Sequence, residues 1–162
     1  MLSKLILVAV VCLIPLNSQF ASSVCTEAIA LAKVKEYSKA KELFVKAIAL
    51  NPYYYGAHYG YGKICLYSGD IKNAIKHLDI AVKLDATSAS GWFYLGFANF
   101  FAKNYVKANY CFKEAYRLDA SFIESLYNIA VIYEITGDTY KSRVYFDKYF
   151  FEKDKKDTGL LF

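Results

Sequence analysis

A period of 34 residues restricts the fold of this chain more than any other feature of its sequence. Small residues recur at this period in two columns, and a bulky column follows the second one a helical turn later, on the same helix face. The register needs no insertion or deletion from about residue 21 to residue 156. An ordinary helical bundle would not keep such a period. The columns are Ala28, Gly62, Gly96 and Ala130, then Ala40, Ala74, Ala108 and Ser142, then Phe44, Leu78, Phe112 and Phe146.

Each period is predicted to form two short helices joined by a tight turn. Gly69-Asp70 and Gly137-Asp138 are turn pairs, in which glycine adopts a positive φ and aspartate caps the next helix. Lys35-Glu36 and Lys103-Asn104 occupy the same two places in the other periods. The predicted helices cover about residues 24–35, 37–50, 57–68, 71–84, 90–103, 105–118, 122–136 and 139–153.

The third period carries the most informative spacing. Trp92, Leu95 and Gly96 are followed by Ala108 and Phe112, and this pattern resembles the tetratricopeptide repeat. The resemblance implies an all-α solenoid of about four helix-turn-helix hairpins in residues 24–156, followed by a short tail at 157–162. The repeats would be residues 21–54, 55–88, 89–122 and 123–156. The chain departs from the family at Asn99, where tyrosine is usual, and at Glu152 and Asp154, which replace a closing leucine and proline.

The first 23 residues have the three-part layout of a secretory signal peptide. Met1–Lys4 is positively charged, Leu5–Ile14 is apolar without interruption, and Leu16–Ser23 is small and polar. Cleavage is expected before Val24, with a cut after Ala21 and an uncleaved N-terminal anchor as the alternatives. The chain is therefore expected to be exported, to the periplasm, the cell envelope or the outside of the cell.

The sequence shows no sign of catalysis. His58 and His77 stand alone along the chain, with no further histidine, cysteine or carboxylate at metal-ligand spacing. No glycine-rich phosphate loop is present. We therefore expect no catalytic residue, no metal and no cofactor. Removal of the signal peptide would leave Cys25, Cys65 and Cys111, which are predicted to be unpaired structural residues.

The charge does not point to nucleic acid. The formal net charge is +5, and the lysines are scattered over the second helices as a solvated face. Membrane contact is expected to be peripheral only, or to run through an uncleaved N-terminal segment.

In tetratricopeptide-repeat proteins, the first helices of successive repeats line a concave groove that holds peptide segments. The resemblance therefore implies an aromatic groove that binds another protein or a peptide. We expect an apolar or proline-rich segment to be favoured over an acidic one, because only Lys63 is well placed to bind a carboxylate. Two alternatives remain open: the rings pack between hairpins instead, or the concavity carries a small apolar ligand such as a lipid. The predicted groove residues are Tyr59, Lys63, Tyr67, Phe93, Phe97, Phe100, Phe101, Tyr127 and Glu134, with Leu66, Ser90 and Val131 beside them.

The last predicted helix carries a cluster of aromatic residues near its C-terminal end, and no polar helix follows it. We expect some of these rings to be exposed, so either residues 160–162 fold back over them or another protein, including a second copy of the chain, covers them. The rings are Tyr145, Phe146, Tyr149, Phe150 and Phe151.

Overall fold

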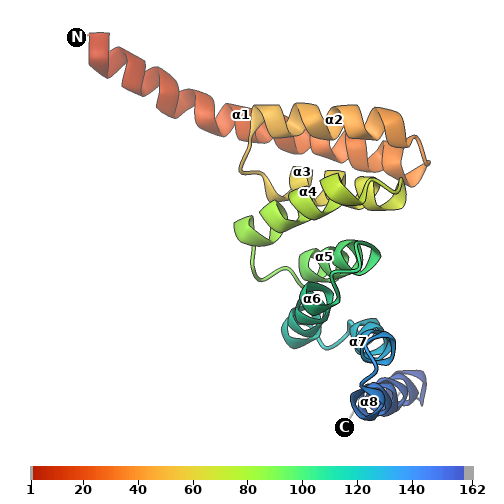
Figure 1. Cartoon of the computed structure of the whole chain (residues 1–162). Coiled ribbons are helices and arrows are strands. Elements are labelled where there is room, and N and C mark those ends of the chain that lie inside the picture. The colour runs from red at the N-terminus through yellow and green to blue at the C-terminus, as the bar shows by residue number, and fades with distance from the viewer. Residues whose placement is uncertain (1, 159–162) are drawn as a thin grey trace. The chain divides into compact units, whose positions relative to one another are not determined.

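The computed structural model describes residues 2–158, with side chains from residue 17 onward, and the regular secondary structure in this part of the chain is all helical (Figure 1). The side chains of the predicted signal segment before residue 17, and residues 160–162 of the predicted tail, lie outside the described residues. The all-α fold of consecutive helical hairpins is confirmed. The eight helices are α1 (Leu2–Lys33), α2 (Tyr37–Leu50), α3 (Tyr55–Tyr67), α4 (Ile71–Leu84), α5 (Ala89–Phe101), α6 (Tyr105–Leu118), α7 (Glu124–Ile135) and α8 (Thr139–Thr158).

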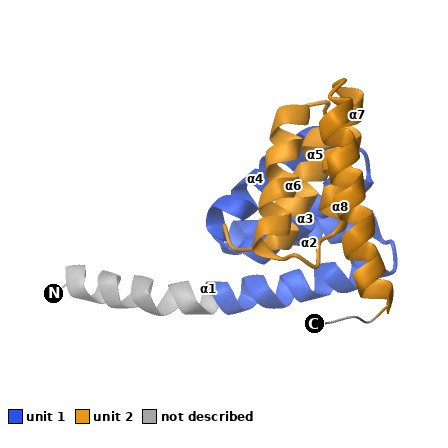
Figure 2. Cartoon of the chain, turned by 90° about the horizontal axis from the view of Figure 1, so that it is seen from below, with its two compact units in different colours: residues 1–85 blue, residues 86–162 orange. Residues whose placement is uncertain are grey.

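The helices pair as consecutive hairpins inside two compact units (Figure 2). Unit 1 covers residues 1–85 and contains the hairpins α1–α2 and α3–α4, and α3 also packs against α1 and α2. Unit 2 covers residues 86–162 and contains α5–α6 and α7–α8, with α6 packed against α7. Division into such units is natural in a repeat array, because each repeat contacts mainly its neighbours.

The small and bulky columns form the core of the hairpins, as the register predicts, except that Phe146 on α8 is only half-buried. Ala40, Ala74 and Ala108 are completely buried, and so are Leu78 and Phe112. A Cβ atom added at Gly62 would lie 2.7 Å from the Leu78 side chain. At Gly96 it would lie 2.8 Å from the Phe112 ring. Glycine is therefore needed where the two helices of a hairpin cross closely.

Every hairpin turn places one residue in the left-handed region. Gly69 and Gly137 have φ values of 78° and 85°, whereas Lys35 and Lys103, at the same repeat position, have φ values of 64° and 60°. The predicted caps are present after both glycines: the Asp70 carboxylate accepts the Asn73 N–H at 3.3 Å. The Asp138 carboxylate accepts the Lys141 N–H at 3.0 Å.

Two helices are longer than the sequence predicts. Helix α1 begins at Leu2 instead of Val24, so it is continuous across the expected cleavage position, and both Ala21 and Cys25 on it are buried. Helix α8 continues to Thr158, beyond the expected end near residue 153, because no proline or glycine interrupts it and the Thr158 hydroxyl donates to the Asp154 carbonyl. Within the described part of the chain, no helix has both the length and the apolar character that a membrane span requires.

Candidate functional site

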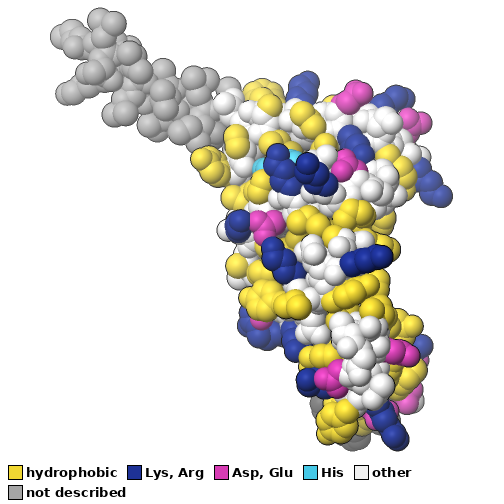
Figure 3. All heavy atoms as spheres, viewed as in Figure 1, with side chains coloured by type: hydrophobic (Ala, Val, Ile, Leu, Met, Phe, Trp, Pro, Cys, Tyr) yellow, Lys and Arg dark blue, Asp and Glu magenta, His cyan; other side chains and the backbone are white. Residues whose placement is uncertain are grey.

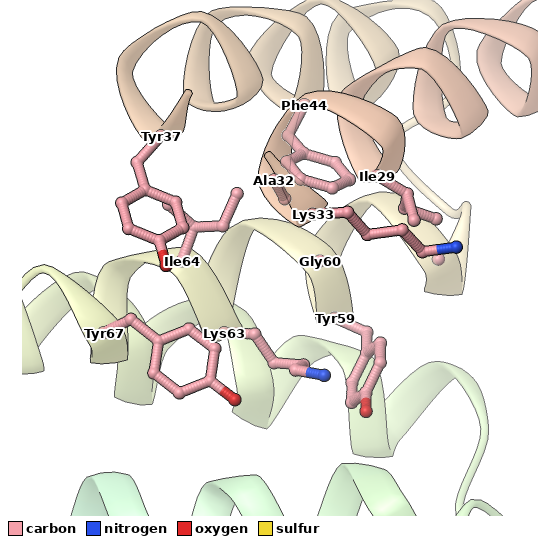
Figure 4. Close-up of a pocket in the computed structure, with 11 residues that line it drawn as sticks. Ile29, Ala32, Lys33, Tyr37, Phe44, Tyr59, Gly60, Lys63, Ile64 and Tyr67 are labelled. Atoms are coloured by element: carbon pink, nitrogen blue, oxygen red, sulfur yellow. The ribbon is translucent and has the colours of Figure 1, made fainter. Parts of the chain in front are cut away.

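A cavity of about 330 Å³ opens in unit 1 between α1, α2 and α3 (Figure 4). Three of its residues belong to the predicted groove, so the structure brings Tyr59, Lys63 and Tyr67 together around one space. Helices α1 and α2 contribute Ile29, Ala32, Lys33, Tyr37 and Phe44. Helix α3 contributes Gly56, Tyr59, Gly60, Lys63, Ile64 and Tyr67.

The cavity exists because small residues line its inner walls. Ala32 reaches only one carbon beyond the backbone of α1, and Gly60 presents no side chain on α3. A Cβ atom at Gly60 would overlap the ring of Phe44, so glycine is also what lets α3 pack this close to α2. The buried Phe44 ring and Ile64 contribute apolar surface to the cavity.

The opening of the cavity carries positive charge. The Lys33 and Lys63 side chains extend toward the same side in Figure 4, from α1 and α3. The Lys63 amine lies 5.2 Å from the centre of the Tyr59 ring, which stacks on Tyr55 with ring centres 5.5 Å apart. Among the described residues that line the cavity, none is acidic. The site is therefore apolar inside and cationic at its rim.

Lys33 is a residue of this site that sequence reasoning missed. It stands 34 residues before Tyr67, at the same repeat position, so the register that selected Tyr67 also indicates Lys33. The predicted groove residues lie in the second, third and fourth repeats, and none lies in the first. With Lys33 included, the site holds two amines instead of one.

The predicted groove residues of unit 2 have mixed surroundings. Phe93, Phe97 and Phe100 are half-buried and pack against the core cluster of Ala108, Phe112, Ile129 and Ile132. The Phe97 and Phe112 ring centres are 5.3 Å apart, in an edge-to-face contact. By contrast, Phe101 is 60% exposed, Glu134 is exposed, and Tyr127 is 45% exposed with its ring against Phe146 and Tyr149. Two further hollows in unit 2, which share Tyr105, Val106 and Thr136, contain none of the predicted residues.

His58 and His77 are not isolated, and the sequence interpretation was wrong on this point. Their Nδ1 atoms lie 3.1 Å apart and their rings stack with centres 5.2 Å apart. The two residues are separated along the chain, but α3 and α4 pack antiparallel and bring them together. His58 Nε2–H donates to the Pro52 carbonyl at 3.0 Å, so His58 Nδ1 is the acceptor and His77 Nδ1–H is the donor. No group of three metal-ligating side chains occurs among the described residues.

Burial keeps this histidine pair neutral. It lowers the pKa of His58 below the ordinary value, and the nearby Lys76 ammonium adds to the effect. The pKa of His77 falls to about 4, chiefly through burial and further through the positive charge of a protonated His58 and of Lys76, while Asp70 opposes the shift. The neutral pair links α3 to α4 by one hydrogen bond. A second hydrogen bond, from His58 to the Pro52 carbonyl, links α3 to the segment before it.

Among the described side chains, Cys25, Cys65 and Cys111 are buried and form no disulfide, as the sequence predicts for structural residues. Burial raises the pKa of the Cys25 thiol to about 11. A thiol with so high a pKa is a poor nucleophile at neutral pH. Cys25 instead contributes to the apolar core of unit 1 with Ala28, Phe44 and Ile64.

Helix α8 exposes a large part of its apolar surface. Only Ser142 is buried on it, whereas Tyr140 is 78% and Phe151 is 59% exposed. Phe150 is exposed as well, which agrees with the expectation that rings of the last helix face solvent. Lysine and arginine side chains are scattered among apolar and acidic ones on the face shown in Figure 3.

Comparison with known proteins supports the repeat architecture. Residues 123–150 match the tetratricopeptide-repeat family, and no curated protein sequence matches the chain. A structure of MamA from Desulfovibrio magneticus RS-1 is similar with a TM-score of 0.79 and 23% identity, covering 85% of this chain and 77% of that one. The first tetratricopeptide-repeat domain of Spaghetti (RPAP3), bound to an HSP90 peptide, gives a TM-score of 0.72 and 17% identity, covering 74% and 95%.

The tetratricopeptide-repeat domain of Arabidopsis OM64 is similar to the same degree. Its TM-score is 0.70 at 18% identity, over 73% of this chain and 98% of that one. At identities this low the likeness establishes the fold alone. The fold is therefore that of a tetratricopeptide-repeat-like helical array.

Proposed function

We propose that this protein is a non-enzymatic interaction module, built of four tetratricopeptide repeats, that binds a segment of another protein through the first helices of its repeats. The observation that carries the proposal is the cavity of unit 1, where Tyr59, Lys63 and Tyr67 surround an apolar space open to a ligand. The fold supports it, since a protein of the same fold is bound to an HSP90 peptide. In unit 2, the exposed rings of Phe101 and Tyr127 also place aromatic surface on the first helices.

A crosslinking pull-down from extracts of the source cells tests this function. Tyr67→Ser with Phe101→Ser removes two first-helix rings that are 58% and 60% exposed. The matched control is Val106→Ser with Tyr140→Ser, which removes two apolar side chains of second helices that are 87% and 78% exposed. We expect the control to retain a partner that the first variant loses. Equal capture by all three proteins would contradict binding through the first helices.

We also propose that the chain is exported and that its first 23 residues direct this. The support is the charged, apolar and small-polar order of that segment. The intact mass of protein from the native fraction decides between cleavage and retention. A mass that starts at Val24 indicates a removed signal peptide, and a mass that starts at Met1 in a membrane fraction indicates an anchor. A full-length protein confined to the cytoplasm would contradict export.

The second candidate function is the carriage of a small apolar ligand such as a lipid. The same cavity favours it, because a volume of about 330 Å³ lies in the range of small-molecule sites and most of its lining residues are apolar. Native mass spectrometry of freshly purified protein would reveal such a ligand as an added mass. Loss of that mass on organic extraction, with no protein partner in the pull-down, would favour this candidate over the first.

A further inference from the structure

The cavity of unit 1 lies where unit 2 places its own phenyl rings. Ile29 and Ala32 correspond to Phe97 and Phe100, two repeats later along the chain. In unit 2 these two rings pack against the core cluster that contains Phe112 and Ile132. In unit 1 the two smaller side chains leave the cavity open.

The surrounding walls are alike in the two units. Tyr37 corresponds to Tyr105, Phe44 to Phe112 and Ile64 to Ile132. In unit 2, the Phe100 ring centre lies 5.9 Å from that of Tyr105, and Phe97 lies 5.3 Å from Phe112, both edge-to-face. Walls of this composition therefore accept a phenyl ring edge-to-face, and Tyr37 and Phe44 offer a ligand the same geometry.

The rim of the cavity in unit 1 differs in charge from the equivalent surface of unit 2. Lys33 stands where unit 2 has Phe101, and Lys63 stands where it has Val131. A ligand ring that enters the cavity of unit 1 would therefore pass two amines from two different helices. A carboxylate beside the ring complements them, because a charge-assisted hydrogen bond is stronger than a neutral one.

We propose that this cavity binds an aromatic side chain of a partner peptide with a carboxylate next to it. The ring takes the place that Phe100 fills in unit 2, and the carboxylate contacts Lys33 and Lys63. The carboxylate is either the C-terminus of the peptide or an adjacent acidic side chain. The inference rests on the proposed function. It differs from the sequence-based expectation that an acidic segment is disfavoured, because that expectation considers Lys63 alone and Lys33 adds a second amine.

Titration of the isotope-labelled full chain with short peptides, followed by NMR, tests the inference. The two probes are acetyl-Gly-Ser-Gly-Phe with a free carboxylate, and acetyl-Gly-Ser-Phe-Asp with an amidated end. The controls are the first probe with alanine in place of phenylalanine, and the first probe with an amidated end. We expect each control to bind at least about tenfold more weakly than the first probe, because one control lacks the ring and the other lacks the charge.

Two variants locate the site. Ala32→Phe introduces the ring that unit 2 has at Phe100 and should reduce binding of the better probe about tenfold, with circular dichroism confirming the fold. Lys33→Gln with Lys63→Gln changes only the rim and should weaken binding severalfold while removing most of its dependence on salt. Val106→Ser, at an exposed position of the second helix α6 in unit 2, should leave probe binding unchanged.

The comparison of the two probes shows whether the carboxylate is a chain end or a side chain. Equal binding of the phenylalanine and alanine peptides, or full binding by Ala32→Phe, would overturn the inference. Tighter binding of dodecanoate than of either peptide, lost in Ala32→Phe, would overturn it in favour of a lipid. If Ala32→Phe still captures the partner that Tyr67→Ser with Phe101→Ser loses, the interaction module stands and only the aromatic cavity ligand is rejected.

Discussion

Unit 1 and unit 2 have the same repeat pattern, but unit 1 has a cavity where unit 2 packs two phenyl rings. At the same repeat positions, unit 2 has Phe97 and Phe100 packed against its core, whereas unit 1 has Ile29 and Ala32 beside an open cavity. The order of the helices, the backbone geometry of the turns and the small-residue columns agree between the units. The choice between packing and binding therefore depends on a few side chains at the inner face of the first helices, and the repeat itself does not determine it.

Removing a ring from unit 2 should have the largest effect on stability. Phe100→Ala would open in unit 2 the space that unit 1 has at Ala32, and we expect a loss of about 2–4 kcal/mol in the free energy of unfolding, because the half-buried ring leaves a void behind. Urea denaturation followed by the fluorescence of Trp92 in unit 2 measures it. The reverse change, Ala32→Phe, should alter stability by no more than about 1 kcal/mol, since the cavity receives the ring. A loss below 1 kcal/mol for Phe100→Ala would mean that the ring is not part of the core.

The period predicts nearly all of the fold and only part of the site. Residues of a column share a local environment, so burial at Ala40 or Phe112 follows from the column alone. The histidine pair does not follow from spacing along the chain, because His58 and His77 are 19 residues apart and meet only across the α3–α4 hairpin. The cavity is hard to predict because it results from a small side chain in place of a ring. The sequence shows this difference only when Ala32 is compared with Phe100.

Acidification should destabilise unit 1 more than unit 2, because both histidines belong to unit 1. The folded protein keeps the pair neutral, with the pKa of His77 lowered from 6.5 to about 4, whereas the unfolded chain takes up protons near pH 6.5. The contribution of the pair is complete above that pH and decreases as the pH falls from 6.5 toward 4. Since the rings are partly screened by solvent, we expect a loss of about 1 kcal/mol between pH 7 and 5.

Hydrogen exchange at these two pH values, corrected for the intrinsic rate, measures the change separately in α3–α4 and α5–α6. Protection should fall in α3–α4 only. In the matched variant, His58→Gln with His77→Gln, the difference between the units should disappear, because glutamine does not titrate in this range. Equal losses in both units would show that carboxylates, and not the histidine pair, are responsible.

The smallest expected effect concerns the turns, where the two units are alike. Each unit has one turn with lysine and one with glycine in the left-handed region, at Lys35 and Gly69 in unit 1 and at Lys103 and Gly137 in unit 2. The hydrogen bonds of the lysine turns match those of the glycine turns: Glu36 N–H donates to the Leu31 carbonyl at 3.0 Å, as Asp70 N–H does to Cys65 at 2.8 Å. The lysines are therefore held in a geometry that costs an L-residue about 1 kcal/mol.

Lys35→Gly and Lys103→Gly should each raise stability by about 0.5 kcal/mol, because relief of this strain exceeds the added entropy of the unfolded glycine. The reverse control, Gly137→Lys, should lower stability by a similar amount, since an added Cβ there meets no atom within 4 Å and only the backbone is strained. Thermal unfolding of all three variants measures the changes. Similar gains at both lysines are expected because the turns have the same geometry in the two units. A gain at Lys103 without one at Lys35 would mean that unit 1 needs the Lys35 side chain itself, and the likeness of the two units would then end at the backbone.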